Sequence, residues 1–365
     1  MGRQNGKDPL KFEIHSLTLS SVSRRSALAY KVSLTNPIPP GEITSSGHLG
    51  PWKTGHLGKT PVAGSYQFRD ANLAALPGIA GVLSSDDHFE GELDEINLQG
   101  AVEIPNFELK DNQHEVALHA QYSATVNALN GDVFLRDVRT SFLQTTVVAS
   151  GQVAGRKGQK GKTTSLSITV HEGRIQDVLS LFVQDKPPLM GVANFQADIL
   201  LPPDRRRFLR NVNLRGDFAI RDERFRNPET ETELDKLSQR ARGNSKQANA
   251  NDPESALSTL SGHVLLRDGV ATFANVIFGV PAASAHLDGN YNLINEKVDF
   301  HGILRAEAEL SQTTSGVKSV LLKPLDRFFK KNNAGTQIPM SLTGTYSNPH
   351  FGVDLNPARK LIQAK

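Results

Sequence analysis

Apolar and polar residues alternate along most of the chain with the period of a β-strand. Residues 12–19, 116–126, 165–170 and 192–200 carry apolar side chains at every second position, which places those side chains on one face of a sheet. Asn-Gly, Asp-Gly and Pro-Pro pairs separate several of these runs and are typical of turns and loops. The pattern predicts a mostly β chain.

A seven-residue phrase recurs four times. It starts with glycine, is apolar at its third and fifth positions, ends in Arg-Asp, and begins at Gly64, Gly131, Gly216 and Gly262. We expect each copy to be a strand that turns at Arg-Asp, with Phe142 and Phe273 on the returning strands of their copies. The repetition predicts an elongated, curved antiparallel sheet of repeated β-hairpins that form a groove, with two or three short helices.

Three segments depart from the strand period. Apolar residues spaced i, i+3, i+4 and i+7 from Ile175 to Phe182 predict a short helix within 173–183. Residues 231–242 have the composition of a polar helix, inside a stretch, 226–256, that is poor in large apolar residues and is expected to be a flexible insertion. Residues 315–331 form a basic amphipathic segment. The predicted organisation is therefore a first groove part (1–225), the insertion, and a C-terminal β region (257–365).

Composition removes several classes of function. The chain has 365 residues with 41 basic and 38 acidic side chains spread along it, so a net charge of +3 gives little support for a nucleic-acid partner. Cysteine is absent, which excludes disulfides, thiolate nucleophiles and cysteine metal sites. The first nine residues are polar and no apolar run reaches about 18 residues, so we expect neither a signal peptide nor a membrane anchor in this chain.

No motif supports catalysis. The sequence 155–164 looks like a phosphate-binding loop, but Arg156 stands where its first glycine belongs and a strand pattern follows, so we interpret it as a hairpin loop. The eleven histidines show no i, i+2 or i, i+4 pair for a metal, and no Gly-x-Ser-x-Gly elbow occurs. We expect no catalytic residue, no metal and no cofactor, although distant residues that converge in the fold would leave an enzyme such as a hydrolase open as a third hypothesis.

Two charged features have two interpretations each. The Arg-Asp pairs either bind anionic head groups or serve as turn residues and edge charges, and we favour the structural role. The segment 315–331 either packs over the open end of the sheet or contacts a membrane surface, in which case its contact residues are Phe328, Phe329, Lys330 and Lys331.

Several phrases, taken together and in order, carry a family resemblance. They are residues 81–85, 89–96, 289–293, 300–304, 319–331, 335–339 and 342–351. In these the chain resembles the C-terminal region of AsmA-like proteins of the bacterial cell envelope, over about residues 60–355. The resemblance implies a β-rich periplasmic body that an N-terminal helix anchors in the inner membrane in full-length members. It also implies a likeness to TamB and to chorein-type proteins, in which phospholipid tails are thought to pass along grooves of repeated β units.

The resemblance and the repeated phrase together predict a lipid-contacting surface. Its candidate residues are the apolar pairs of the phrase and one further phenylalanine: Tyr66, Phe68, Val133, Leu135, Phe218, Ile220, Val264, Leu266 and Phe273. The alternative is that these residues form a sealed sandwich core. We expect a non-enzymatic lipid-binding or lipid-transfer protein that supports outer-membrane assembly, with phospholipid or another envelope lipid, a membrane surface and other envelope proteins as partners. The alternative from a different class is an envelope scaffold that binds proteins through its β surface without lipid.

Overall fold

A computed structural model describes residues 11–23, 25–76, 78–110, 114–156, 158–182, 186–187, 189–203, 207–225, 259–280, 283–306, 337–345 and 348–353. Its contacts divide the chain into two compact units. Unit 1 comprises Met1–His171, Asp177–Lys186 and Asp198–Asn211, and unit 2 comprises Glu172–Gln176, Pro187–Ala197 and Val212–Lys365.

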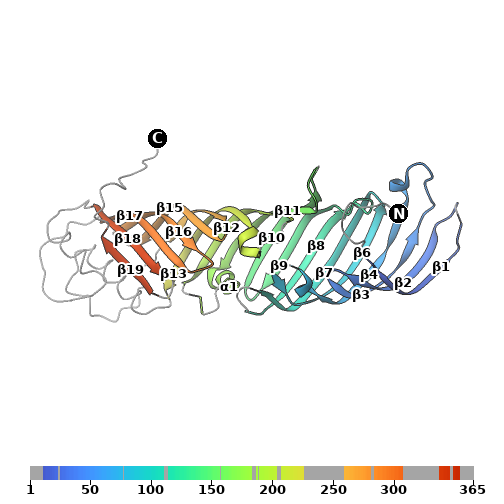
Figure 1. The fold of residues 1–365 in the computed structure, drawn as a ribbon, viewed down its shortest axis with the longest axis horizontal. Helices are drawn as coiled ribbons and strands as arrows, with labels where there is room; N and C mark the ends of the chain where they lie inside the picture. Colours follow the sequence, from blue (N-terminus) through green and yellow to red (C-terminus); the bar gives the residue numbers. More distant parts are fainter. Residues whose placement is uncertain are drawn as a thin grey trace, which may run out of the picture. The chain divides into compact units, whose positions relative to one another are not determined.

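Unit 1 is built on an antiparallel sheet whose strands pair with their neighbours in the chain (Figure 1). Its strands are β1 (Glu13–Ser20), β2 (Leu28–Pro37), β3 (Pro40–Leu49), β4 (Pro61–Asn72), β6 (Val82–Glu92), β7 (Glu95–Leu109), β8 (Val116–Val126), β9 (Val133–Phe142), β10 (Thr145–Gly155) and the main part of β11 (Lys162–Arg174). The two-residue strand β5 (Ile79–Ala80) pairs with β7, so β4 pairs directly with β6.

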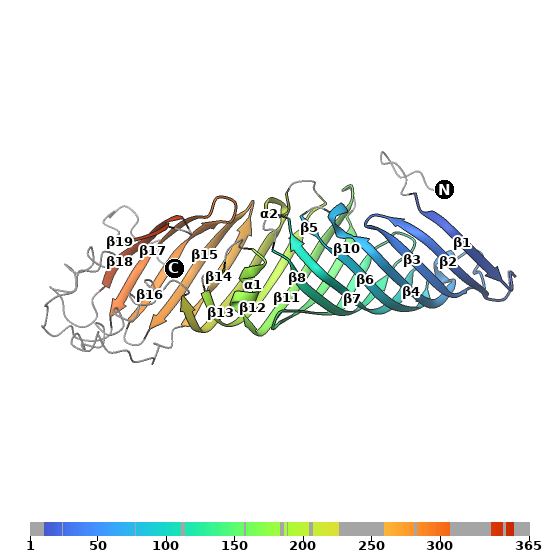
Figure 2. The same cartoon turned by 90° about the horizontal axis from the view of Figure 1, so that it is seen from below.

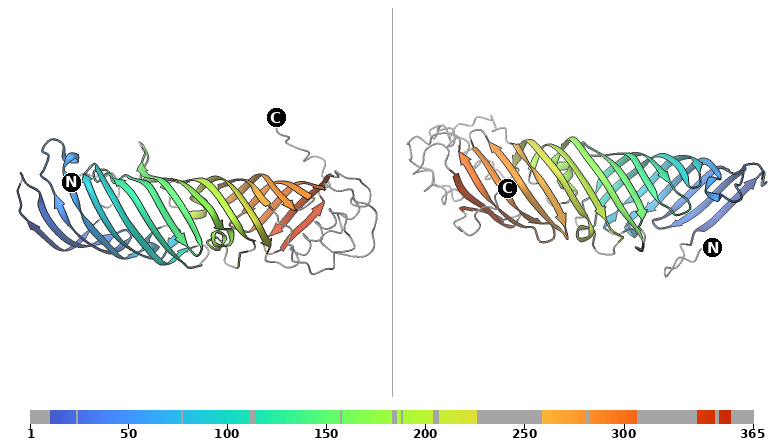
Figure 3. Two further views of the ribbon diagram at one scale, coloured as in Figure 1. Left: turned by 180° about the vertical axis from the view of Figure 1, so that it is seen from behind. Right: turned by 90° about the horizontal axis from the view of Figure 1, so that it is seen from above.

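Unit 2 repeats this plan. Most of β12 (Leu189–Leu201) lies in it, followed by β13 (Asn213–Phe225), β14 (Thr259–Arg267), β15 (Val270–Val280), β16 (Ala283–Asn292), β17 (Lys297–Ala306), β18 (Gln337–Thr345) and β19 (Asn348–Val353). From β13 to β19 each strand pairs antiparallel with the next, in the order that the colours of Figures 2 and 3 follow. The prediction of a mostly β chain, a curved antiparallel sheet with two or three short helices, is confirmed: the part of the chain that the structure describes has an open sheet and two short helices.

The helices are α1 (Ile175–Ser180) and α2 (Phe208–Asn211), with single 3₁₀ turns η1 (Leu57–Lys59) and η2 (Leu73–Ala75). The helix predicted within 173–183 is α1. Its apolar stripe is half-buried, and its buried side chains are Asp177 and Ser180. The Asp177 carboxylate accepts hydrogen bonds from the backbone of Gln144, at 3.0 Å, and the hydroxyl of Thr145, at 2.9 Å. A buried carboxylate thus fastens this short helix to the turn between β9 and β10.

Other predicted segments lie outside the described residues. These are the insertion 226–256 and the amphipathic segment 315–331 with its membrane-surface candidates Phe328, Phe329, Lys330 and Lys331. The predicted hairpin loop at 155–164 is the connection between β10 and β11. No helix in the described part of the chain has the length and apolar character needed to cross a bilayer.

The expectation that every Arg-Asp pair marks a turn is wrong. Only Asp268 turns the chain, with φ of 50°, because Gly269 follows with φ of 78° and the pair supplies the two positive φ angles of a hairpin turn. In the first and second copies the Arg-Asp residues lie within β4 and β9, at β-bulges where two residues oppose one on the partner strand. The third copy lies within β13, where Asp222 has φ of 54°.

The bulges also change where one phenylalanine lies. Phe273 is on the returning strand β15, as expected, but Phe142 ends the same strand β9 that contains its copy of the phrase. Valine follows Arg-Asp in this copy where glycine follows in the fourth, so the chain continues as a strand and turns only after Phe142. The hairpin plan therefore recurs with strands of different length.

Candidate functional site

One face of the unit 1 sheet is mostly apolar and is called its inner face. The strand register places on it the rows Leu19, Tyr30, Gly47, Gly64, Phe89, Leu98, Ala124, Leu135, Gly151 and Leu166; Leu17, Val32, Ser45, Tyr66, Asp87, Gly100, Tyr122, Val138, Ala149 and Ile168; and Ile14, Leu34, Ile43, Phe68, Ser85, Val102, Ala120, Thr140, Val147 and Val170. Val133 lies on the same face between Val126 and Val153. All four candidates of unit 1, Tyr66, Phe68, Val133 and Leu135, therefore share one face.

The inner face of unit 2 is apolar as well. Its rows are Leu214, Leu266, Ala271, Tyr291 and Val298; Gly216, Val264, Phe273, Gly289, Phe300 and Leu342; and Ile220, Leu260, Phe278, Ala285 and Leu304. Phe218 lies on this face opposite Gly262. The five candidates of unit 2, Phe218, Ile220, Val264, Leu266 and Phe273, are thus brought together, and Phe300 joins them although the phrase did not include it.

Aromatic residues on the inner face of unit 2 lie beside glycines of the neighbouring strands. Phe218 on β13 lies opposite Gly262 on β14, Phe273 on β15 lies opposite Val264 on β14, and Gly289 on β16 separates Phe273 from Phe300 on β17. The ring centroids of Phe218 and Phe273 are 5.9 Å apart, and those of Phe273 and Phe300 are 5.5 Å apart. Alternate strands are separated by roughly 9.6 Å. The rings of Phe218 and Phe300 therefore lean toward Phe273, over Gly262 and Gly289, where a Cβ would lie 3.3 Å and 2.5 Å from these rings. The three rings therefore form a continuous aromatic surface that lies close to the sheet backbone.

The side chains on the two inner faces differ in how much of their surface is exposed to solvent. Ile220, Leu266, Val276 and Ala285 are buried, whereas Phe218, Val264, Phe273 and Phe300 are half-buried. At the edge strand β1 the inner-face residues Ile14, Leu17 and Leu19 are 57%, 54% and 47% exposed. A fully sealed core would bury such side chains, so part of the apolar face remains accessible within each unit.

A polar cluster interrupts the inner face of unit 1. Asp87 is 1% exposed and accepts hydrogen bonds from the hydroxyls of Ser85 and Tyr122, each at 2.6 Å. The hydroxyls of Tyr66 and Tyr122 are 3.3 Å apart, although these residues lie three strand spacings, roughly 14 Å, from each other. Both side chains therefore lean over β6 and β7. Burial raises the pKa of Tyr66 to about 12 and, with Tyr66 and Asp87 adding to the effect, raises that of Tyr122 further.

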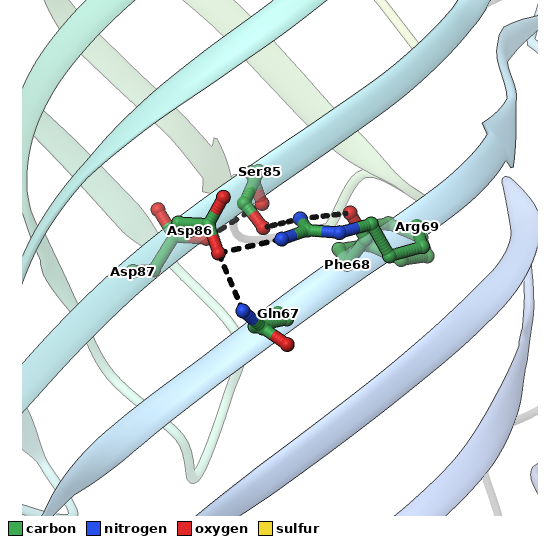
Figure 4. Close-up of polar contacts among 6 residues, drawn as sticks. All are labelled: Gln67, Phe68, Arg69, Ser85, Asp86 and Asp87. Atoms are coloured by element: carbon green, nitrogen blue, oxygen red, sulfur yellow. Dashed lines mark hydrogen bonds and ion pairs between the residues drawn. The ribbon is translucent and has the colours of Figure 1, made fainter.

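The opposite face of the sheet is polar and is called the outer face. Figure 4 shows Arg69 at the β4 bulge, where its guanidinium donates to the backbone oxygen of Ser85 and to the Asp86 carboxylate, each at 2.6 Å. Gln67 also donates to Asp86, at 2.8 Å. The Arg69 guanidinium, followed by Gln67, lowers the pKa of Asp86. Arg69 thus satisfies polar groups beside the bulge, which is a structural role but not the predicted role of a turn residue or edge charge.

The outer face of unit 2 carries an open hollow. It is lined by residues that include Thr272, Asp288, Asn290, Asp299 and His301. His301 Nε2 lies 2.8 Å from Asp299 Oδ1, and Thr272 hydrogen-bonds with Asn290. In the part of the chain that the structure describes, no group of three or more histidine or acidic side chains is placed to hold a metal ion.

Sequence reasoning found the apolar pairs but missed the residues that connect them. Phe89 and Phe300 lie outside the phrase, and their signal is a glycine directly opposite on the neighbouring strand, Gly64 and Gly289. Asp87 had no such signal, because an acidic residue within a polar stretch of β6 is ordinary in sequence.

Comparisons with protein-family models, with curated proteins and with solved structures gave no match for this chain. The resemblance to AsmA-like proteins therefore stays a prediction.

Proposed function

We propose that this protein is a non-enzymatic lipid-binding or lipid-transfer protein of the bacterial cell envelope, in which the apolar inner faces hold acyl chains. The observation that carries the proposal is the in-register, half-buried apolar surface of each unit. An apolar surface of this kind needs a lid, a partner or a ligand. The envelope location and a role in outer-membrane assembly rest on the resemblance to AsmA-like proteins.

The energetics favour an acyl chain as the ligand. Burial of one methylene gains about 0.8 kcal/mol, so a chain of roughly 16 carbons with about half of its surface covered gains on the order of 6 kcal/mol. The aromatic surface of Phe218, Phe273 and Phe300 extends across several strands, and its apolar character is similar on each of them. A lipid on such a surface therefore meets no single position of much lower binding free energy. This property suits transfer as well as storage.

Native mass spectrometry of the purified chain, with extraction of bound lipid, tests the proposal. Val264→Asp with Leu266→Asp places two charges on the inner face and is expected to abolish co-purified phospholipid. The matched control, Ile277→Asp with His286→Asp, places two charges on the outer face of neighbouring strands and is expected to retain it.

Folding must be separated from binding in this test. Leu266 is buried, so Val264→Asp alone, at a half-buried position, is the second variant, and circular dichroism monitors the fold of all variants. A folded wild type that carries no lipid, and takes none from labelled vesicles, would refute the proposal.

The edge strand β1 favours the alternative of a protein-binding scaffold. All its residues are exposed, and it pairs on one side only, with β2, among the described strands. An edge with free backbone groups and apolar side chains at alternate positions is a template for an added strand. A photo-crosslinker at Leu17 that captures one defined envelope protein, together with an absence of bound lipid, would favour the scaffold over lipid transfer.

A further inference from the structure

The polar cluster of Ser85, Asp87, Tyr66 and Tyr122 is built into the apolar inner face of unit 1. Gly100 makes room for it, because a Cβ at this position would lie 1.6 Å from Asp87 Oδ1. Asp87 forms no ion pair with any described residue, and its two oxygens accept from neutral hydroxyls. A carboxylate that is removed from water without a cation is costly, so the cluster needs a physical or functional reason.

The hydrogen bonds of the cluster have one consistent direction. Tyr122 has a single hydroxyl hydrogen and gives it to Asp87 at 2.6 Å. At 3.3 Å, Tyr66 must therefore donate its own hydrogen to the Tyr122 oxygen. Because the pKa of each tyrosine is raised, both hydroxyls stay protonated at neutral pH. The relay from Tyr66 through Tyr122 to Asp87 leaves the Tyr66 oxygen as an acceptor, and no described side chain donates to it.

The surroundings of this acceptor specify the donor. The ring of Phe89 lies 6.4 Å from the ring of Tyr66, centroid to centroid, so the Tyr66 ring lies beside another aromatic side chain of the inner face. The relay ends in a carboxylate that has no cationic partner among the described residues, so a positive donor is favoured over a neutral one. A primary ammonium group supplies both the N–H and the charge.

We infer that the Tyr66 hydroxyl, oriented by Tyr122 and Asp87, recognises the primary ammonium group of an aminophospholipid whose acyl chains lie on the inner face. The inference rests on the proposed lipid-binding function. Tyr66 contacts the ligand, whereas Asp87 and Tyr122 are positioning residues that act through it. The site would prefer phosphatidylethanolamine to phosphatidylcholine, because choline carries the same charge without an N–H donor.

The test offers the protein vesicles that contain equal amounts of these two lipids with identical acyl chains, and native mass spectrometry measures the ratio bound. The wild type is expected to enrich phosphatidylethanolamine roughly tenfold or more, as one hydrogen bond to a charged group allows. Tyr66→Phe keeps the ring and removes the acceptor, so the ratio should fall toward one while total bound lipid is retained. Ser65→Ala, which removes a hydroxyl from the outer face beside Tyr66, should keep the wild-type ratio.

Asp87→Asn is the second variant and should reduce the ratio through the relay; if it does not fold, Tyr66→Phe still decides. Lipid binding without a preference in the wild type, or a preference that Tyr66→Phe retains, would overturn the inference and leave the proposed function standing. A wild type that binds neither lipid would overturn both.

Discussion

The raised pKa of Tyr66 makes the stability of unit 1 sensitive to alkaline pH. Burial raises this pKa from 10.0 to about 12, so in this interval the tyrosine is ionised in the unfolded chain and protonated in the folded one. The unfolded state then binds fewer protons, and the free energy of unfolding falls as pH rises. Each pH unit corresponds to about 1.4 kcal/mol, so Tyr66 accounts for a loss on the order of 3 kcal/mol by pH ~12 and for none well below pH ~10.

Urea unfolding at several pH values between about 9 and 11 measures this effect. The only tryptophan, Trp52, lies in unit 1 and reports on the unfolding of the part that contains Tyr66. Tyr66→Phe removes the ionisable hydroxyl, so the variant should lose less stability than the wild type as pH rises. Tyr122 contributes in the same direction, so some pH dependence should remain.

Ser65→Ala is the matched control, because it removes a neighbouring hydroxyl that does not ionise and that lies on the outer face. It should show the same alkaline slope as the wild type. Parallel slopes for the wild type and Tyr66→Phe would show that the Tyr66 hydroxyl is not held in the buried relay, and the reasoning would fail.

Three further perturbations test the sheet itself. Phe273→Ala removes contacts with two rings and should lower the free energy of unfolding by about 3 kcal/mol in urea titrations, whereas Ile277→Ala, on the exposed outer face, should change it by less than about 1 kcal/mol. Gly289→Ala would place a Cβ 2.4 Å from a backbone oxygen of β17 and should cost about 1–3 kcal/mol by the same assay; a neutral effect would contradict the close approach. Arg69→Gln removes the main cause of the lowered pKa of Asp86, so this pKa should rise when it is measured by NMR titration; an unchanged value would show that the ion pair is absent in solution.

The sequence predicted the fold class and the composition of the inner faces because both depend on a period of two. Alternation fixes which side chains share a face of a strand, and serial pairing then brings Phe218, Val264 and Phe273 to one surface without further information.

The difference between turn and bulge could not be predicted from the Arg-Asp pair alone. Arg-Asp is compatible with both, and the following residue decides: glycine after Asp268 permits a hairpin turn, whereas alanine after Asp70 lets the strand continue. Glycine at that position is the signal that separates the fourth copy from the others.

The polar cluster of Tyr66, Asp87 and Tyr122 could not be predicted from the sequence for a different reason. Tyr66, Asp87 and Tyr122 meet only when four strands pair in one register, and Gly100 must lie between them. A shift of one residue in any pairing would turn one member to the outer face. Such a site depends on register, which local patterns do not specify.

The pairing of nearly every strand with the next one along the chain has a consequence for how the molecule forms. From β6 to β11, and again from β14 to β17, the contacts that define the sheet join residues close in sequence, so little loop-closure entropy opposes each step. Each unit is able to grow hairpin by hairpin on the last strand formed, in the direction of synthesis. The same locality allows evolution to lengthen or shorten such a chain by whole hairpins, because the remaining pairs keep their register.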